Sequence, residues 1–466
     1  MSKISIANLK KTIYYLQRNG LRDTFLAALE RLQEKSGPAA CEGPGSPEDS
    51  EEYDTRKVLS PEKLQLQRER GWQEKVKFSI LVPAYRTPEV FLRAMIDSVL
   101  EQTYGELELI LADASGDESV KKVADTYRDS RLVYVPLENN AGISENTNAA
   151  LEKARGDYVA LLDHDDVLTP DALYEMALQI ERKRLAGERA AILYSDEDKC
   201  DETGSRYYEP HRKMDFNLDL LLSNNYICHF LAVETELARK VGFRREYDGA
   251  QDYDFVLRCV AALAAESGGL GAAQDRILHI PRILYHWRCH RGSTAVNPRS
   301  KMYAYEAGEQ AVKSFLEGCG WRGQVKPLHH LGFYRVHYDH VFEDRPELGA
   351  VGGPVWDRKK KMIGGIYRAS GRCPYEGLSR GFSGYMHRAA LQQEAFAVDV
   401  RNMVLRPGLW ETYEQVTGVP YSEREQRFPK AAASEAEQNA AYVRLSLELA
   451  RKIHEKGYRI LWDPEL

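Results

Sequence analysis

Short apolar runs alternate with amphipathic segments in the first half of the chain. The amphipathic segments at 117–128 and 144–154, and a third that opens at Thr87-Pro88, have apolar residues at helical spacing. Strands that alternate with helices predict an α/β domain, with a mostly parallel central sheet and helices on both faces. The apolar runs that predict its buried strands lie at 78–82, 107–112, 132–135 and 158–162.

The pattern divides the chain into three parts. Residues 1–75 predict an N-terminal helical region, with two short helices near the start and another at 61–74. The stretch at 36–52 is rich in Gly, Pro and acidic residues, which is typical of a flexible linker. Residues 76–330 form the predicted main domain, and residues 331–466 form a smaller C-terminal α/β region.

Composition narrows the class of protein. With 43% hydrophobic and 29% charged residues, the 466-residue chain is typical of soluble globular proteins. Its net charge of −6 argues against a nucleic-acid partner. The seven cysteines form no CxxC pair, which indicates a reducing compartment and disfavours both a disulfide framework and a zinc site. Because the sequence also lacks a long apolar run and a signal-peptide core, we expect a cytoplasmic protein.

The first 35 residues are basic, and two interpretations of them stay open. The two predicted helices could pack on the main domain. They could instead make peripheral contact with the anionic inner face of the cell membrane. The basic residues concerned are Lys3, Lys10, Lys11, Arg18 and Arg22.

A cluster of acidic residues follows the strand at 158–162 directly, as Asp163-His164-Asp165-Asp166. In open α/β sheets, ligands bind at the carboxyl ends of the strands. Clustered carboxylates suit a hard divalent cation such as Mg²⁺ or Mn²⁺, which can in turn hold a diphosphate. An Asp-rich turn could instead cap the next helix, but Thr169-Pro170-Asp171 already supplies a cap. Right-handed crossovers would bring the segment 83–86, Asp113 and this cluster to one sheet edge.

Several motifs, taken together, resemble a known family over about residues 76–320. The chain is similar to family 2 glycosyltransferases, which have the Rossmann-like GT-A fold. Later motifs resemble a bacterial subgroup that builds surface polysaccharides of the cell envelope, such as rhamnose-containing capsule or O-antigen chains. Many members have two adjacent Asp residues where this chain has Asp113-Ala114. The motifs are Phe78-Ser79-Ile80-Leu81-Val82-Pro83-Ala84-Tyr85, Gln102-Thr103-Tyr104, Asp113-Ala114-Ser115, Asn140-Ala141-Gly142, Asn146, Asn148, Asp163-His164-Asp165, then Tyr194-Ser195-Asp196-Glu197-Asp198-Lys199, Gln251-Asp252-Tyr253-Asp254 and Leu284-Tyr285-His286-Trp287-Arg288.

The resemblance implies roles for individual residues. Asp252 would be the general base, with a helix-start acid as the alternative interpretation. Asp165 would ligate a divalent metal, Mn²⁺ or Mg²⁺, with His286 as a second ligand or, alternatively, a core histidine. Nucleotide or donor contacts are implied for Pro83, Ala84, Tyr85, Asp113, Asn148, Asp163 and His164. Further donor or acceptor contacts are predicted for Asp196, Glu197, Gln251, Trp287 and Arg288.

Two further strands carry some of these residues toward the predicted cleft. A strand at 191–193 would end just before Asp196 and Glu197, and both would face the cleft from the side opposite Asp165. A strand at 280–285 would end just before His286, with Arg288 in a loop after it. The alternatives are an acidic turn for the first pair and a solvated basic loop for Arg288.

The C-terminal region reads as an incomplete second copy of the main domain. Segments at 347–353, 396–398, 405–410 and 457–462 follow the order of the main domain's later elements. A nucleotide-binding half is missing before them, and the acid-bearing segment is replaced by the Glu-, Arg- and Ala-rich stretch 421–439. We therefore expect residues 331–466 to be non-catalytic and to serve as a support, a dimer contact or an acceptor groove.

These features predict a metal-dependent, inverting glycosyltransferase. It would move a sugar from a nucleotide-diphosphate donor, a UDP- or dTDP-sugar, to a hydroxyl of a growing, lipid-linked glycan. The alternative is an inactive scaffold, derived from such an enzyme, in a polysaccharide assembly complex. A dinucleotide-dependent oxidoreductase is disfavoured because no G-x-G-x-x-G follows the first strand. The donor sugar, the acceptor and the oligomeric state stay open.

Overall fold

The computed structural model of the chain forms two compact units. The large-sheet unit contains residues 51–216 and 225–315, and the C-terminal unit contains residues 217–224 and 316–466 with residues 1–50. The predicted linker at 36–52 and most of the predicted N-terminal helix pair lie outside the described residues. The structure describes residues 16, 17, 19–22, 24–26, 28, 29, 59–290, 302–423, 428 and 434–466.

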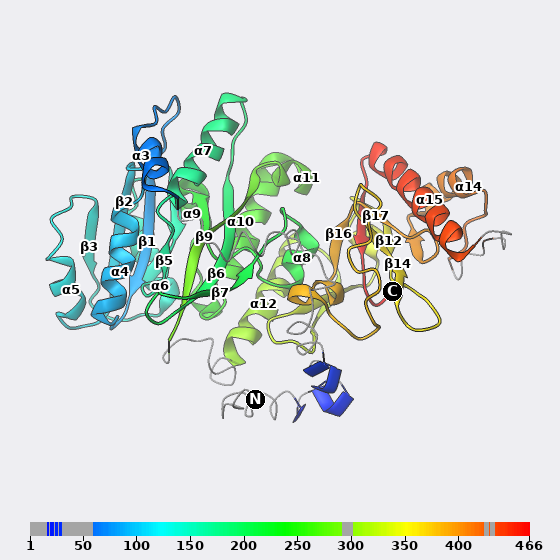
Figure 1. Cartoon of the computed structure of the whole chain (residues 1–466), viewed down its shortest axis with the longest axis horizontal. Coiled ribbons are helices and arrows are strands. Elements are labelled where there is room, and N and C mark those ends of the chain that lie inside the picture. The colour runs from blue at the N-terminus through cyan, green and yellow to red at the C-terminus, as the bar shows by residue number, and fades with distance from the viewer. Residues whose placement is uncertain are drawn as a thin grey trace. The chain divides into compact units, whose positions relative to one another are not determined.

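The described residues of the large-sheet unit build a nine-stranded sheet in the order β3-β2-β1-β4-β8-β6-β9-β5, with β7 paired to β6 (Figure 1). Strands β3, β2, β1 and β4 run parallel to one another, whereas β8 lies antiparallel between β4 and β6. The predicted α/β class is thus confirmed. The strands are β1 Phe78–Ala84, β2 Leu107–Asp113, β3 Leu132–Pro136, β4 Tyr158–Leu161, β5 Val167–Leu168, β6 Ile192–Asp201, β7 Tyr207–His211, β8 Leu231–Glu234 and β9 Ile277–Cys289.

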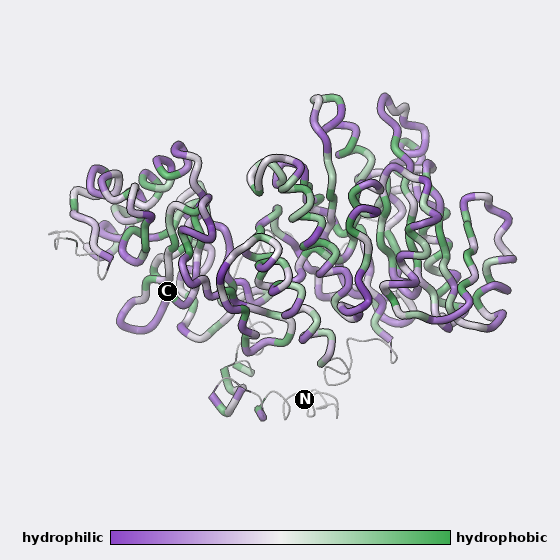
Figure 2. Tube along the Cα trace, turned by 180° about the vertical axis from the view of Figure 1, so that it is seen from behind, coloured by the Kyte–Doolittle hydropathy of each residue, from purple (hydrophilic) through white to green (hydrophobic). Residues whose placement is uncertain are grey.

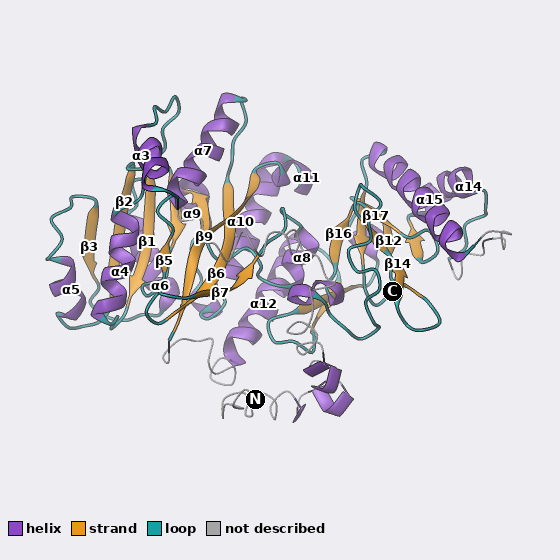
Figure 3. Ribbon diagram, in the orientation of Figure 1, coloured by secondary structure: helices purple, strands orange, loops and turns teal. Residues whose placement is uncertain are grey.

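Helices flank this sheet (Figure 3), and apolar stripes hold them to it. In α4, Leu92, Met95, Ile96 and Val99 recur at the three- and four-residue spacing of one helix face, and all four are buried in the core. The tube in Figure 2 is hydrophobic along the strands beneath these helices. The helices are α3 Pro61–Glu69, α4 Glu89–Leu100, α5 Ser119–Ala124, α6 Ile143–Lys153, α7 Ala172–Leu185, α9 Thr235–Val241, the 3-10 turn η1 Arg245–Tyr247, α10 Gln251–Ser267, α11 Leu270–Gln274 and α12 Met302–Cys319.

Strands β6 and β9 are much longer than the predicted strands at 191–193 and 280–285. They pair in parallel from Ile192 and Ile277 to Asp201 and Cys289. Backbone hydrogen bonds between the two strands carry the acidic segment 194–199 into the sheet, although Asp and Glu disfavour strands by themselves. The predicted loop at Arg288 is therefore wrong, and so is the alternative of an acidic turn at Asp196, because both residues lie on paired strands.

Other predicted boundaries shift by a few residues. The helix predicted at 61–74 ends at Glu69, and the one predicted at 117–128 is only Ser119–Ala124. Thr169 is not the N-cap of the next helix as predicted, because that helix begins at Ala172 with Asp171 as its N-cap residue. The Thr169 hydroxyl donates to the Asp171 carboxylate. Within the described part of the chain, no helix has the length and apolar character needed to cross a bilayer.

The C-terminal unit contains a smaller sheet in the order β16-β19-β12-β18. Its central strand β12 pairs in parallel with β19 and antiparallel with β18. Strand β6 of the large sheet pairs in the same way, parallel with β9 and antiparallel with β8. The two sheets thus share this pairing in the same chain order, and the partial second copy stays a prediction.

The elements of the C-terminal unit are mostly short. A core of apolar residues, among them Leu405, Tyr413, Ile453 and Trp462, packs the long helix α15 against the sheet. The elements are α8 Leu218–Ser223, β10 Gly323–Pro327, β11 Tyr334–Tyr338, α13 Val341–Asp344, β12 Leu348–Gly352, β13 Val355–Trp356, β14 Met362–Gly364, β15 Ile366–Tyr367, the 3-10 segment η4 Tyr385–Ala390, β16 Gln393–Ala395, β17 Ala397–Val398, β18 Met403–Leu405, η5 Pro407–Leu409, α14 Trp410–Thr417, α15 Glu435–Glu455 and β19 Arg459–Trp462.

Candidate active site

The ends of β1 and β2 form the first part of the site. Ala84 and Asp113 are register partners at the carboxyl ends of these strands. The Asp113 carboxylate is buried and accepts hydrogen bonds from the Tyr134 hydroxyl and the Ser115 N–H, both at 2.9 Å. Tyr85 follows with its side chain exposed. The structure therefore brings the predicted residues of this group to one sheet edge, with Asp113 already held by the protein.

Asn148, predicted as a donor contact, has a structural role instead. Its side-chain amide donates to the carbonyl oxygen of Phe243 and accepts from the N–H of the same residue, both at 2.8 Å. This two-way bond fixes α6 to the segment after α9. Because both ends of the amide are engaged, the prediction of a nucleotide contact at Asn148 is not supported.

The acidic cluster after β4 separates into exposed and buried carboxylates. The side chains of Asp163 and Asp165 are 48% and 21% exposed, whereas Asp166 is only 1% exposed. Asp166 accepts hydrogen bonds from the Tyr285 hydroxyl at 2.5 Å and the Arg288 N–H at 2.7 Å. Burial, together with the charges of Asp163 and Asp165, raises the pKa of Asp166 well above its usual range. Asp166 thus anchors the loop, and the other two carboxylates are open to a ligand.

Arg288 holds the same loop from strand β9. Its Nε donates to the backbone carbonyl of Asp165 at 2.7 Å, and its Nη1 donates to the carbonyl of Glu202 at 2.9 Å. The side chain is buried, with its guanidinium over the Phe91 ring. Arg288 therefore positions the acidic loop, and the predicted donor contact is not supported.

The histidine beside Asp165 is His290, not His286. The Nε2 of His290 lies 2.8 Å from Asp165 Oδ2. His286 instead bonds Asp198 through its Nδ1 at 2.5 Å. Successive side chains on a strand point to opposite faces, so Tyr285 reaches Asp166 while His286 points away. The alternation does not apply to His290, because β9 ends at Cys289 and His290 lies just beyond the strand. The predicted role of His286 as the second metal ligand is therefore not supported by its position, and sequence reasoning missed His290.

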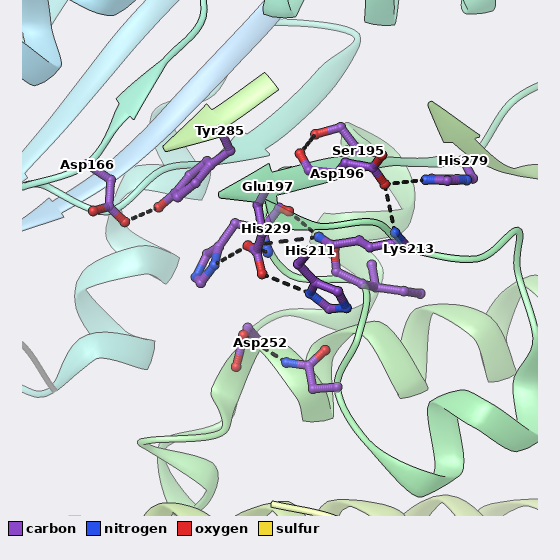
Figure 4. Close-up of polar contacts among 12 residues, drawn as sticks. Asp166, Ser195, Asp196, Glu197, His211, Lys213, His229, Asp252, His279 and Tyr285 are labelled. Carbon is purple, nitrogen blue, oxygen red and sulfur yellow. Dashed lines mark hydrogen bonds and ion pairs between the residues drawn. The ribbon is translucent and has the colours of Figure 1, made fainter. Parts of the chain in front are cut away.

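A cationic cluster surrounds Glu197 (Figure 4). One carboxylate oxygen of Glu197 accepts the His229 N–H at 2.6 Å and lies 3.1 Å from His229 Nδ1. The other lies 3.2 Å from His211 Nδ1, and the Lys213 ammonium is 3.9 Å from the carboxylate. Burial by itself raises the pKa of Glu197, but the Lys213 charge and the two imidazoles hold it well below its usual range. Glu197 is therefore a buried anion that orients His229.

Asp196 and Glu197 do not face an open cleft as predicted, because both are buried. The Asp196 carboxylate accepts the Lys213 N–H at 2.8 Å and lies 2.9 Å from His279 Nε2. His229, which sequence reasoning missed, approaches the site in their place, with its Nε2 4.0 Å from Asp163 Oδ2. A polar histidine inside the apolar run 226–233 was the available signal.

Asp252 opens helix α10 and faces the site. Its carboxylate accepts a hydrogen bond from Asn225 Nδ2 at 3.0 Å. It lies close enough to Asp163 for the charge of one to act on the other. Its neighbour Asp254 is buried and paired with Arg244 and Arg258 instead. The two acids of this motif therefore separate into a partly exposed one in the site and a structural one.

Comparison with known proteins identifies the domain. Residues 79–242 match the sequence pattern of Glycosyl transferase family 2. The chain carries a family 2 glycosyltransferase domain. This match confirms the predicted family, and the sheet described above confirms the predicted α/β class.

The curated relatives of the chain include proteins named for polysaccharide synthesis. The chain is 44% identical over 243 residues to an uncharacterized protein of Sinorhizobium fredii, and 33% identical over 284 residues to the O-antigen biosynthesis protein RfbC of Myxococcus xanthus. These matches cover 51% and 58% of this chain but only 25% and 21% of the relatives. Chondroitin synthase of Escherichia coli is 29% identical over 47% of the chain and 30% of that protein.

One solved structure resembles part of the chain. The crystal structure of residues 1–349 of Staphylococcus aureus TarS in complex with UDP is 20% identical, with a TM-score of 0.38. It aligns with 52% of this chain and 65% of that one.

Three remaining predicted contacts of the family 2 domain have distinct environments. Gln251 accepts the Gly249 N–H at 2.8 Å, which fixes the turn before α10. Trp287 is half-buried, with the Lys199 ammonium 5.6 Å from its ring centroid. His164 Nδ1 is buried and has no hydrogen-bond partner among the described residues. This nitrogen lies beside the acidic loop, 4.0 Å from Asp165 Oδ1.

The stability of the family 2 domain is expected to fall as the pH rises from 6.5 through 9. Burial lowers the pKa of His229, but the hydrogen bond to Glu197 and the charges of Asp163 and Asp166 raise it to about 9. A group whose pKa is raised by folding stabilises the fold below its unfolded value and loses this contribution above its folded value. Melting temperatures measured against pH should show this decline, and His229→Asn should flatten it. Some decline should persist in that variant, because the pKa of His279 is raised as well. An unchanged slope in His229→Asn would contradict the expectation.

Proposed function

We propose that the family 2 domain transfers a sugar from a nucleotide-diphosphate donor to a hydroxyl of a growing cell-surface glycan. The observation that carries the proposal is the joint presence of two ligand-accessible carboxylates, Asp163 and Asp165, with the partly exposed Asp252 near Asp163. The family match supports the reaction class. The relative named for O-antigen biosynthesis supports a glycan acceptor, and we propose that this glycan is lipid-linked.

The residues around Asp165 fit a divalent metal that is completed by the donor. No group of three or more His, Cys, Asp or Glu side chains in the described residues is arranged to hold a metal ion. Mg²⁺ is usually bound through one or two carboxylates plus substrate phosphates rather than by a protein cage. The Asp165 carboxylate and the imidazole of His290, 2.8 Å apart, would hold such an ion. Once bound, it would act as a Lewis acid for the leaving diphosphate.

Asp252 would take the proton of the acceptor hydroxyl. As this oxygen attacks the anomeric carbon, the carboxylate accepts its proton and the nucleoside diphosphate leaves from the opposite face. Such a single displacement inverts the anomeric configuration. Asn225 Nδ2 donates to Oδ2 of Asp252 at 3.0 Å, and the Cys228 thiol also contacts this carboxylate.

Asp163 would bind the donor's sugar or ribose hydroxyls, with His229 keeping it oriented. The cationic imidazole lies between the buried Glu197 and the exposed Asp163. Burial raises the pKa of Asp163 above its usual range, and the charge of His229 opposes this rise by favouring the ionised carboxylate, which accepts hydrogen bonds only. This arrangement supports a role in hydroxyl recognition for Asp163, separate from the metal-binding role of Asp165.

The first experiment measures nucleotide binding by the whole chain. We expect UDP or dTDP with Mn²⁺ to raise the melting temperature by several degrees at about 100 times the dissociation constant. GDP serves as the comparison, and each nucleotide is tested with and without Mn²⁺. Release of the same nucleoside diphosphate from its sugar donor would then identify the donor. A chain that no nucleotide stabilises, with or without metal, and that releases none from any donor would be the inactive scaffold instead.

A further inference from the structure

Helix α8 belongs to a different unit from the residues on either side of it. In sequence it lies inside the family 2 domain, between β7 and β8, yet residues 217–224 belong to the C-terminal unit. All six residues of α8, Leu218–Ser223, are buried. The chain therefore leaves the family 2 domain after Phe216, places a buried helix in the C-terminal unit, and returns at Asn225.

A buried ion pair holds α8 within the C-terminal unit. The Asp219 carboxylate bonds the Arg345 guanidinium through both oxygens, at 2.6 and 3.3 Å. Arg345 is 2% exposed, and its guanidinium lies 4.4 Å from the Trp321 ring centroid. Removing one partner of such a pair leaves a buried charge with fewer partners, which is strongly destabilising for the contact.

Backbone contacts lock both ends of the helix. At its start, the Asn217 side chain donates to the Glu394 carbonyl at 3.0 Å and accepts the Glu394 N–H at 2.9 Å. At its end, the Ser223 hydroxyl donates to the Gln392 carbonyl at 3.2 Å. Strand β16 and the residue before it thus hold α8 at two points, in addition to the ion pair.

The two chain segments that flank α8 are tied together inside the family 2 domain. The buried Lys213 ammonium donates to the carbonyl of Ile227 at 2.7 Å and also to the carbonyl of His229. The returning segment then places Asn225 against Asp252. Asn225 Oδ1 has no hydrogen-bond partner among the described residues. Among the described residues, the side chain of Asn225 makes its hydrogen bond to Asp252, and its backbone follows directly from α8.

We propose that α8 is a strap through which the C-terminal unit positions Asn225, and through it the carboxylate of Asp252. Asn225 is then a positioning residue for the transfer reaction, and the inference rests on the proposed function of Asp252. Only Asn224 separates Asn225 from the last residue of α8. A displacement of α8 therefore moves Asn225 directly. In this proposal α8 acts through Asn225 and contributes no reacting group.

A double-mutant cycle on the full chain tests the strap. Asp219→Asn and Asn225→Ala should each lower kcat by between about 10- and 100-fold, because a misplacement of about 1 Å can cost that much. The donor KM should stay unchanged in both variants. If α8 acts through Asn225, the double variant should be no slower than Asn225→Ala alone. Effects on kcat that multiply, or a normal kcat in Asp219→Asn, would overturn the proposal.

A matched control separates the strap from general loss of stability. Asp399, like Asp219, is a buried carboxylate of the C-terminal unit, paired with Arg401 at 2.7 Å, and it makes no hydrogen bond or ion pair with the described residues of α8. Asp399→Asn should lower the melting temperature but leave kcat as in the wild type. A matching fall in kcat would mean that stability alone explains the Asp219 effect.

Hydrogen exchange tests the strap even if the chain transfers no sugar. Peptides covering 225–230 should exchange faster in Asp219→Asn than in the wild type, and at the wild-type rate in Asp399→Asn. This readout does not depend on activity, so it distinguishes failure of the strap from failure of the proposed function. Unchanged exchange at 225–230 in a folded Asp219→Asn variant would refute the proposed role of α8, whether or not the chain transfers a sugar.

Discussion

Asp252→Asn lowers the kcat of sugar transfer by about 10²–10⁴-fold, the contribution of a positioned general base. The substitution keeps the size of the side chain but removes the charge that accepts the acceptor's proton. Asn225 can still donate to the remaining oxygen, so the local structure should hold. Donor KM and the nucleotide-dependent rise in melting temperature should match those of the wild type, because Asp252 acts on the acceptor hydroxyl.

Asp254→Asn is the matched control for this prediction, since it lies in the same helical turn. Asp254 is buried and paired with Arg244 and Arg258, so its loss should lower the melting temperature. Where the variant remains folded, its kcat should stay near the wild-type value. Loss of donor binding in Asp252→Asn, or an equal fall in kcat in Asp254→Asn, would reject Asp252 as the base.

Asp165→Asn abolishes the part of nucleotide binding that depends on Mn²⁺. A ligand at about 100 times its dissociation constant stabilises a protein by about 2.7 kcal/mol, so the lost stabilisation is readily measured as melting temperature. The physical reason is that an amide is a weaker and uncharged ligand for a hard cation. Any nucleotide response that needs no metal should persist, because Asp113 and Tyr85 are untouched.

The two histidines near the site provide the matched pair for this prediction. His290→Ala should weaken Mn²⁺ by about 10–100-fold, the usual effect of losing a group bound to a metal ligand or close to it. His286→Ala should leave Mn²⁺ affinity unchanged, because its imidazole bonds Asp198. A larger loss of Mn²⁺ affinity in His286→Ala than in His290→Ala would instead identify His286 as the histidine that binds the metal. Equal nucleotide binding with and without Mn²⁺ in the wild type would exclude the metal role of Asp165.

The parallel half of the sheet was predictable because its strands are local features of the sequence. Strands β1, β2, β3 and β4 are short apolar runs between amphipathic helices, and each formed close to where it was expected. Strands β6 and β9 were not fully predictable. Their second halves carry acidic, basic and aromatic residues, and only their pairing with each other makes them strands. Such pairing joins residues about 85 positions apart and leaves no local periodicity to detect.

The site was predictable as a set of carboxylates but not as a set of roles. The position of the acidic cluster after β4 follows from the strand that precedes it, and the Asp252 motif follows from the family resemblance. Burial then gives the residues of each pair different roles: Asp166 and Asp254 are buried, whereas Asp163 and Asp252 are partly exposed. Neighbouring Asp residues look alike in sequence, whereas the direction of each side chain depends on the loop and helix that carry it.

The sequence by itself determined that this chain contains an α/β domain of family 2, with carboxylates at the carboxyl edge of its sheet. Apolar periodicity and the order of the motifs are properties of the amino-acid sequence alone, so they can be read before the fold is known. The tertiary structure decided that His290 rather than His286 meets Asp165, that Glu197 is buried against His229, and that α8 belongs to the C-terminal unit. These facts depend on the register between paired strands and on the residue at which each strand ends. Residues far apart in sequence come into contact only when the register and the strand ends are both fixed by the fold.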